Sequence, residues 1–451
     1  MIAFSIYART HLNNFVNSGL LEEIGKKLNL QVIVSKHFDS TNIANGNHCM
    51  ESPNIPKLLI SVSNFIQLVN LWKHREASMA HYVRAISTFG SKSERSNWKC
   101  VVFTNMEISP ARRFCVKYFS RGIPNRFILG FELLLRNIFI SRAFRNSLKD
   151  VKVLIIPFSG HLAYEFGTYI WAARKNNIPT IALQENWDNL SSKTIITEEP
   201  DYFLVWGEQS ASHIRSVHKL TNCVVIVNGS PRFDEYFKSK SHEPVAISPS
   251  GERVTINSPF ILIAGTGDGL DDLALIRSVN LAIGRLRESS RVVYRPHPLT
   301  RSKIDFTGLA SEFPNLLIDS HPDSKKFNHH IGLIQNCTLL VNHFSTLTLE
   351  ALIAKRLVCV PLYLGRQDSV YGYDRILAEW LHLTGINQMK GATFPRSQQE
   401  LETSIEKLLE SGTGFVNDTD WYCKPGRYSD GLIPVIHTIL DELVSNINQF
   451  K

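Results

Sequence analysis

Short apolar runs recur along most of the chain and constrain its fold more than any other feature. The run VKVLIIPF is apolar throughout, which is typical of a strand buried on both faces of a sheet. Stretches with helical spacing separate most of the runs, and strands that alternate with helices predict parallel sheets. We therefore predict an α/β fold with strands within residues 151–158, 178–184, 201–207, 223–229, 260–265, 291–296, 315–319, 338–343 and 357–363.

One stretch near the middle of the chain breaks this pattern. Residues 238–259 are rich in Ser, Pro and Lys and have no sustained apolar periodicity, which is typical of a linker. A length of 451 residues also favours two or three domains. We predict two α/β domains with a cleft between them, and the bounds are 1–240 for the first domain, 241–258 for the linker, 259–435 for the second domain and 436–451 for a C-terminal helix.

Cysteine usage and the N-terminus indicate the compartment. The seven cysteines are scattered and form no CxxC pair, which favours a reducing compartment and argues against a structural zinc. The N-terminal run MIAFSIYARTHL has no basic start, so it predicts a first strand rather than a signal peptide. No run of roughly 18 apolar residues occurs, so we expect no membrane-spanning helix. We expect a cytoplasmic protein.

The charge is distributed unevenly. The net charge of +8 divides into +11 for residues 1–240 and −3 for the remainder, and residues 57–149 hold 16 basic residues against 4 acidic ones. A basic N-terminal half predicts an anionic partner, either a phospholipid surface, a charged glycan or a nucleic acid. No recognised nucleic-acid-binding module is present, so we do not expect a nucleic acid.

Residues 126–149 allow two interpretations. The segment is apolar nearly all round, but Glu132 and Arg136 interrupt it, and it is too short and too charged to span a bilayer. It is either a buried helix of the first domain or a helix on the cytoplasmic face of the inner membrane. In the second case its basic end would contact anionic headgroups through Arg142, Arg145 and Lys149.

Glycine, histidine and hydroxyl residues follow three strands of the second half. Ligands of open parallel sheets bind beyond the carboxyl ends of the strands. Glycines let backbone N–H groups approach a phosphate, two prolines hold the histidine between them rigid, and hydroxyls at a helix start bind phosphate together with exposed N–H groups. The predicted nucleotide-binding residues are Gly265, Thr266, Gly267, Asp268, Arg295, His297, Pro298, Ser345, Thr346 and Glu350.

These motifs also carry a family resemblance. The order of His-Pro, then Ser-Thr with Glu350 before a helix, then a strand beginning LVCVP resembles the donor domain of GT-B glycosyltransferases. The chain is especially similar to the CMP-dependent bacterial sialyltransferases and Kdo transferases, and it resembles CDP-glycerol and CDP-ribitol phosphotransferases as well. Residues 184–237 look like part of a surface-carbohydrate biosynthesis protein of this superfamily, and the whole resemblance covers 151–365. It implies two Rossmann-like domains whose parallel sheets face a central cleft.

The resemblance implies roles for individual residues. His297 would protonate or hydrogen-bond the leaving phosphate, Ser345 and Thr346 would hold that phosphate, and Glu350 would contact the ribose. The acidic base motif of the sialyltransferases is absent, and the sequence around Glu165 matches it only in part.

A catalytic base is therefore sought among the carboxylates of the first half. Glu185 and Asp188 directly follow the strand 178–184, so we rank Asp188 first, with Glu185 and Glu165 behind it. The alternative for Asp188 is a helix or turn cap. We expect Trp187 to stack on a sugar and Asn189 to contact the acceptor.

The leading hypothesis is a glycosyltransferase of bacterial surface polysaccharide biosynthesis, such as capsule or lipopolysaccharide. Its donor would be a nucleotide sugar, for example an ulosonic acid such as Kdo or sialic acid, and its acceptor a glycan or glycolipid. The alternatives are a CDP-glycerol or CDP-ribitol phosphotransferase, a UDP-sugar 2-epimerase and a non-catalytic scaffold of a polymerase complex. We expect no cofactor and no metal, since Asp271 and Asp272 have no third ligand and fit a helix cap. His329 and His330 are expected at the surface.

Overall fold

The computed structural model divides the chain into two compact units. The described residues of unit 1 lie within 1–95, 105–234 and 419–451, and those of unit 2 lie within 235–418. The structure describes residues 1–451 apart from 39–42, 44–47, 90–108, 161, 238–241, 258, 266–271, 287–290, 298–304, 314–315, 322–326, 365–372, 412–418 and 450–451.

Unit 1 is built on a parallel sheet of seven strands in the order β3-β2-β1-β4-β5-β6-β7. Ile2 at the start of β1 pairs with Leu30 of β2 on one side and with Val153 of β4 on the other. The order therefore reverses between β1 and β4, and this switch point is where ligands bind in open α/β sheets. The strands are β1 (Ile2–Ile6), β2 (Leu30–Val34), β3 (His48–Glu51), β4 (Val153–Phe158), β5 (Thr180–Gln184), β6 (Tyr202–Val205) and β7 (Val224–Val227).

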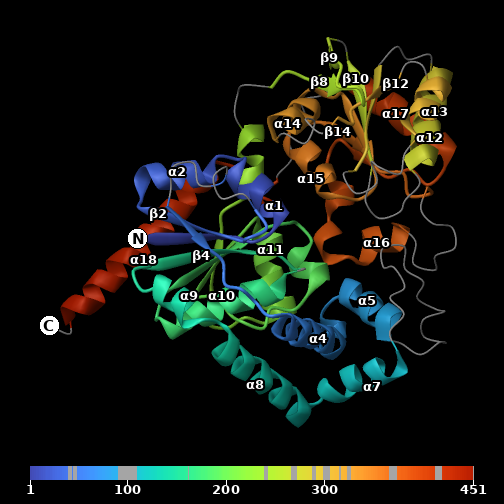
Figure 1. Ribbon diagram of the computed structural model, residues 1–451. Coiled ribbons are helices and arrows are strands. Elements are labelled where there is room, and N and C mark those ends of the chain that lie inside the picture. Colours follow the sequence, from blue (N-terminus) through green and yellow to red (C-terminus); the bar gives the residue numbers. More distant parts are fainter. Residues whose placement is uncertain are drawn as a thin grey trace. The chain divides into compact units, whose positions relative to one another are not determined.

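Helices cover both faces of this sheet because its strands are apolar on both sides. Side chains of α10 (Ala163–Lys175) and α9 (Arg142–Ser147) pack on one face, and those of α2 (Leu20–Lys27) and α18 (Tyr428–Gln449) pack on the other. The further helices of unit 1 are α1 (Arg9–His11), α4 (Lys57–Lys73), α5 (Met79–Phe89), α7 (Pro110–Phe119), α8 (Gly122–Phe139) and α11 (Glu208–His213), and Figure 1 shows α7 and α8 outside α4.

Unit 2 repeats the same topology with six parallel strands in the order β12-β11-β10-β13-β14-β15. Its switch point lies between β10 and β13, which pair from Ile261 to Ala264. The strands are β10 (Phe260–Ala264), β11 (Arg291–Arg295), β12 (Leu316–Ile318), β13 (Leu339–Asn342), β14 (Leu357–Cys359) and β15 (Ala392–Thr393). The helices are α12 (Asp272–Leu286), α13 (Phe306–Glu312), α14 (Phe327–Asn336), α15 (Thr346–Ile353), α16 (Tyr373–Glu379) and α17 (Gln398–Ser411).

The predicted α/β fold with two parallel sheets is confirmed. Every apolar run that predicts a strand forms one, and so does the N-terminal run. Sequence analysis did not predict β2 and β3, which extend the first sheet on the far side of β1.

The division into units differs from the predicted bounds in two places. The boundary falls between Asp234 and Glu235, and the predicted linker carries an antiparallel pair, β8 (Val245–Ile247) and β9 (Arg253–Thr255). Residues 419–451 return to unit 1, where the N–H of Lys424 donates to the Trp206 carbonyl at 2.8 Å. The cause of this return is the apolar side of α18, which covers one face of the first sheet.

Residues 126–149 form most of α8 and all of α9. Within the part of the chain that the structure describes, no helix combines the length and the apolar character needed to cross a bilayer.

Candidate functional site

Polar side chains gather at the switch point of unit 1, where β1, β4 and β5 end. Tyr7 follows β1 and Glu185 follows β5. The hydroxyl of Tyr7 donates to the carbonyl of Pro157 in β4, and the amide of Asn14 donates to the carbonyl of Glu185 at 3.1 Å. These bonds join the segment after β1 to the ends of β4 and β5, so they fix the surroundings of the Glu185 carboxyl.

Glu185 is a buried carboxyl with a strongly shifted pKa. Its side chain is only 2% exposed, and burial raises its pKa from 4.5 to about 7, against hydrogen bonds from Ser159 and Asn189 that lower it. The hydroxyl of Thr10 donates to Oε1 of Glu185. A carboxyl whose pKa lies near neutral pH is suited to accept and release a proton in turn.

His11 faces the same carboxyl. Its Nε2 lies 3.9 Å from Oε1 of Glu185, while its Nδ1 accepts from the backbone N–H of Tyr7 at 3.4 Å. Burial lowers the pKa of His11 to about 3, so the ring is neutral and its proton sits on Nε2. Among the described residues, Nε2 has no hydrogen-bond partner, so a buried N–H is directed toward this carboxyl.

Glu165 is a second carboxyl in this region, and it is partly buried. It lies in the first turn of α10, and burial raises its pKa to about 7. Burial raises the pKa of Tyr7, and the charges of Glu185 and Glu165 raise it further, so both carboxyls act on one tyrosine. Tyr7 stacks on Tyr169 with ring centroids 5.5 Å apart. The switch point of unit 1 thus carries two carboxyls of raised pKa among aromatic and hydroxyl groups.

Asp188 has a different environment from Glu185. Its Oδ2 lies 2.8 Å from the ammonium of Lys193 and accepts from the Ser192 hydroxyl at 3.1 Å, and its side chain is 27% exposed. A carboxylate paired with a cation is a weaker base than a desolvated one. The structure therefore favours Glu185 over Asp188, which reverses the order derived from sequence.

Trp187 and Asn189 are both buried in this structure, and their predicted contacts with an acceptor stay predictions. Trp187 is 2% exposed, donates from Nε1 to Oε1 of Gln209 at 3.0 Å and packs edge-on against Tyr422. The amide of Asn189 donates to the carbonyl of Phe158 at 3.0 Å. Neither side chain offers a surface for a sugar to stack on, because both hold the loop after β5 in place.

The switch point of unit 2 brings together the ends of β10 and β11. A Cβ at Gly265 would lie 2.3 Å from Oδ2 of Asp272 and 3.2 Å from the backbone nitrogen of His297. A larger residue would have to displace the Asp272 side chain and press on the His297 backbone, so glycine suits this close approach. The predicted residues Thr266, Gly267, Asp268 and Pro298 lie outside the described residues.

The N-terminus of α15 lies at the same switch point, directly after β13. Ser345 is the N-cap, and its hydroxyl accepts from the N–H of Leu347 at 3.2 Å and from the amide of Asn342 at 2.9 Å. Thr346 is the first helical residue and is partly exposed. The unpaired N–H groups and the dipole of a helix N-terminus favour an anion.

Glu350 is fully buried in this structure, and its predicted contact with a ribose stays a prediction. Its Oε2 accepts from the hydroxyl of Tyr236 at 2.8 Å and interacts with Nε2 of His330 at 2.9 Å. The carboxyl therefore offers no surface to a ligand in this structure. It joins the segment before β8, α14 and α15 instead.

Arg295 is anchored by a buried carboxylate. Its Nη1 donates to Oδ2 of Asp319 at 2.5 Å, and Asp319 also contacts Nε2 of His329 at 2.9 Å. Burial would raise the pKa of Asp319, but the hydrogen bond from His329 and the charge of Arg295 lower it below its ordinary value. Asp319 thus fixes the guanidinium of Arg295 at the end of β11, and the predicted contact of Arg295 with a phosphate stays a prediction.

His329 and His330, expected at the surface, are partly buried. Each histidine contacts a buried carboxylate, Asp319 and Glu350 respectively. The sequence holds no signal for these pairs, because the partners lie 10 and 20 residues away on other elements.

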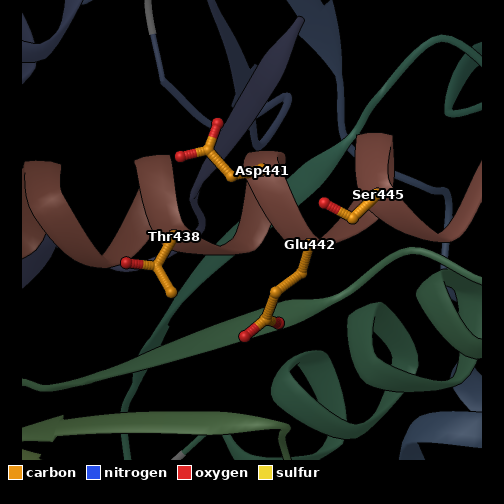
Figure 2. Close-up of a pocket in the computed structure, with 4 residues that line it drawn as sticks. All are labelled: Thr438, Asp441, Glu442 and Ser445. Carbon is orange, nitrogen blue, oxygen red and sulfur yellow. The ribbon is translucent and has the colours of Figure 1, made fainter. Parts of the chain in front are cut away.

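Two further features lie apart from these clusters. Asp272 accepts from the Tyr294 hydroxyl at 2.8 Å, and the described residues contain no group of three or more His, Cys, Asp or Glu side chains arranged to hold a metal. A surface hollow is lined by four side chains of α18, shown in Figure 2: Thr438, Asp441, Glu442 and Ser445. Glu442 accepts from Tyr202 at the start of β6, so the hollow lies at the amino ends of the strands, opposite the switch point.

A scan against protein-family models found no match, and a search of curated proteins found no relative. Solved structures do match. The UDP-GlcNAc 2-epimerase of Methanocaldococcus jannaschii has a TM-score of 0.53 at 10% identity, over 97% of this chain and 99% of that one. A putative UDP-N-acetylglucosamine 2-epimerase of Listeria monocytogenes has a TM-score of 0.53 at 10% identity, over 98% and 96%. MurG of Acinetobacter baumannii matches over 90% of each chain at 11% identity with a TM-score of 0.42. At these identities the first two likenesses show the fold, which is the GT-B arrangement of two Rossmann-like units.

Proposed function

We propose that this chain is an enzyme that acts on a nucleotide-activated sugar, and that it transfers the sugar to a glycan or glycolipid acceptor. The observation that carries the proposal is the grouping of anion-binding features at the switch point of unit 2. Gly265, the His297 backbone and the N-terminus of α15 come from three neighbouring strand ends there. This is the position at which open α/β sheets bind phosphate groups.

In this proposal unit 2 holds the nucleotide phosphate. The N–H groups at the start of α15 bind phosphate oxygens, and Arg295 adds a guanidinium that Asp319 holds in position. His297 donates a hydrogen bond or a proton to the leaving phosphate. Stabilising the negative charge that develops on the leaving group lowers the barrier to transfer.

Unit 1 supplies the base. The Glu185 carboxylate removes the proton from the acceptor hydroxyl as the new glycosidic bond forms. Its pKa of about 7 leaves much of it ionised at neutral pH, yet makes it more basic than an exposed carboxylate. The hydroxyl of Thr10 orients the carboxyl, and the neutral ring of His11 lies beside it.

The sequence resemblance favours a CMP-linked ulosonic acid as donor and a surface polysaccharide or its lipid-linked precursor as acceptor. A CDP-glycerol or CDP-ribitol phosphotransferase would use the same features, because its leaving group is also a cytidine nucleotide. A measurement of which nucleotide the chain binds, cytidine or uridine, distinguishes the CMP- and CDP-linked donors from UDP-sugars.

A UDP-sugar 2-epimerase is the second candidate, and two observations favour it. The fold likeness to two solved 2-epimerase structures spans nearly the whole chain. Epimerisation at C2 also requires a base that removes a proton from carbon, and Glu165 and Glu185 form a pair of carboxyls with raised pKa. The basic residues of the first half have no role in such a reaction.

A thermal-shift panel with CMP, CDP, UMP, UDP and GDP tests the proposal. A nucleotide that binds the folded chain raises its melting temperature. A shift with CMP supports an ulosonic acid donor, a shift with CDP supports an alditol phosphate, and a shift with UDP supports a UDP-sugar enzyme. No shift with any of the five would contradict the enzyme and favour a non-catalytic scaffold.

If UDP binds, incubation with UDP-GlcNAc in D₂O without an acceptor separates the two UDP-linked functions. An epimerase exchanges the proton at C2 for deuterium, which removes the C2 proton signal from the NMR spectrum. A transferase leaves that signal intact.

A further inference from the structure

The helix α8 turns charged residues toward the interior and many apolar residues toward solvent, the reverse of a usual amphipathic helix. Its charged residues Glu132 and Arg136 are buried, whereas Phe127 on the same helix is 72% exposed. A surface helix of a globular protein normally turns its apolar stripe inward. A broad apolar side of α8 therefore faces solvent, while the inward side carries Glu132 and Arg136 beside the buried Leu135.

An ion-pair network fixes this orientation. Oε1 of Glu132 accepts from the Ser63 hydroxyl in α4 and from Nη2 of Arg136 at 2.8 Å. Nη1 of Arg136 donates to the carbonyl of Gly167 at 3.0 Å and to Oε1 of Glu198 at 2.9 Å. Rotating the apolar side inward would break these buried bonds and leave unpaired charges, at a high energetic cost.

The exposed side of α8 is a continuous apolar stripe, extended by α7. Residues three or four positions apart share one side of a helix. On α7, Phe114 and Tyr118 are exposed and stacked, with centroids 6.2 Å apart. We call the whole surface the α7–α8 face, which consists of Phe114, Tyr118, Ile123, Phe127, Phe131, Leu134 and Ile138.

The exposed charged side chains of residues 109–149 have a single sign. Residues 109–149 contain nine basic residues and one acidic residue, and that acidic residue is the buried Glu132. Arg112, Arg121 and Arg126 are exposed on α7 and α8, and Arg142 is exposed at the start of α9. The apolar stripe is thus bordered by cations and by no exposed carboxylate of this segment.

We propose that the α7–α8 face is a docking surface for an anionic lipid bilayer. Apolar side chains would enter the boundary between headgroups and acyl chains, and the arginines would contact anionic headgroups, as in helices that lie in the membrane plane. A second copy of the chain fits the face poorly, because a two-fold contact would bring its arginines against the same arginines of the partner. An anionic surface offers the complementary charge.

Vesicle co-sedimentation of the full-length protein tests this proposal. We expect binding to vesicles of 70% phosphatidylcholine and 30% phosphatidylglycerol, with little binding to phosphatidylcholine alone. Replacing Phe127 and Phe131 together by Ser should lower the partition coefficient about tenfold or more. The pair Arg121→Gln and Arg126→Gln should lower it roughly tenfold, and added salt should weaken wild-type binding.

Matched controls keep the test specific. Leu281 and Val444 are exposed apolar residues outside this face, and Lys355 and Lys407 are exposed cations outside it. Replacing the first two by Ser, or the second two by Gln, should leave binding within twofold of wild type. Melting temperatures should stay close to wild type in every variant, because only exposed side chains change.

Three results would overturn the proposal. The first is that the wild-type protein does not bind anionic vesicles. The second is that the double variant Phe127→Ser, Phe131→Ser binds them as well as wild type does. The third is that light scattering shows a wild-type dimer that the double variant converts to a monomer. The last result would assign the face to a second copy instead. Nucleotide binding is measured without lipid, so failure of this proposal and failure of the proposed function are separate outcomes.

Discussion

Nε2 of His11 lies 3.9 Å from Oε1 of Glu185, and both side chains are almost fully buried. The ring carries its proton on Nε2, since Nδ1 accepts from the backbone of Tyr7. A neutral N–H donor therefore faces a carboxyl whose pKa burial raises to about 7. The neutral ring places no positive charge beside the carboxyl, so burial keeps the pKa of Glu185 raised.

Replacing Glu185 by Gln tests its role as the base. The variant keeps the shape of the side chain but cannot accept a proton, so we expect kcat to fall by about 100-fold or more. Wild-type kcat should rise with pH and level off above about pH 7, because only the ionised carboxyl accepts the proton. Asp188→Asn is the control and should lose less than about tenfold. An equal or larger loss with Asp188→Asn would restore Asp188 as the base.

The second carboxyl, Glu165, should make stability depend on pH. Its folded pKa of about 7 exceeds the ordinary 4.5, so between these values the folded chain holds a proton that the unfolded chain has released. Its contribution is complete below about pH 4.5 and is lost as pH rises to about 7. The glutamine of Glu165→Gln is neutral at every pH. The free energy of unfolding of the variant minus that of wild type should therefore be about 2–3 kcal/mol larger at pH 8 than at pH 5. Urea denaturation at both pH values measures this, and a constant difference would refute it.

Arg136 and Arg174 offer a matched pair, because both contact Glu198. Arg136 is 2% exposed and Arg174 is 54% exposed. Arg136→Met leaves Glu132 and Glu198 without a buried cation, so we expect a loss of about 3–5 kcal/mol in the free energy of unfolding. Arg174→Met should cost less than about 1 kcal/mol, because water screens an exposed pair. Equal losses in chemical denaturation would show that burial does not govern this network.

The strands of both sheets could be predicted because their apolar runs are strong signals. Runs such as VKVLIIPF allow few other structures, and the polar residues that follow them fall at the carboxyl edges of the sheets as expected. The strand β2 was missed although LQVIV is also an apolar run, since its neighbours resemble no known motif. The return of residues 419–451 was missed because nothing local in a sequence states which sheet a distant helix covers.

Roles that depend on burial could not be predicted. Glu185 and Asp188 lie three residues apart after one strand, and only the structure shows that one is desolvated and the other paired with Lys193. The orientation of α8 is a similar case. Its composition fits a buried helix or a membrane helix equally, and the ion pairs of Arg136 decide which side faces outward.

Gly207→Ala tests the return of the C-terminal segment onto unit 1. A Cβ at Gly207 would lie 2.5 Å from a backbone carbon of Tyr422, so the segment must shift. We expect a loss of about 1–3 kcal/mol in the free energy of unfolding and faster proteolysis within 419–451. Gly122→Ala, where a Cβ meets nothing within 4 Å, is the control and should be nearly neutral. An equally stable Gly207→Ala would mean that this contact does not hold the segment.

Isothermal titration calorimetry of nucleotide binding tests the central claim most directly. Wild type, His297→Ala and the control His437→Ala, which removes an exposed histidine of α18, would each be titrated with CMP, CDP and UDP. The account predicts that wild type and the control bind at least one nucleotide with equal affinity. It predicts that His297→Ala weakens that binding about tenfold, or about 1.4 kcal/mol. Absence of binding in wild type, or unchanged affinity in His297→Ala, would contradict it.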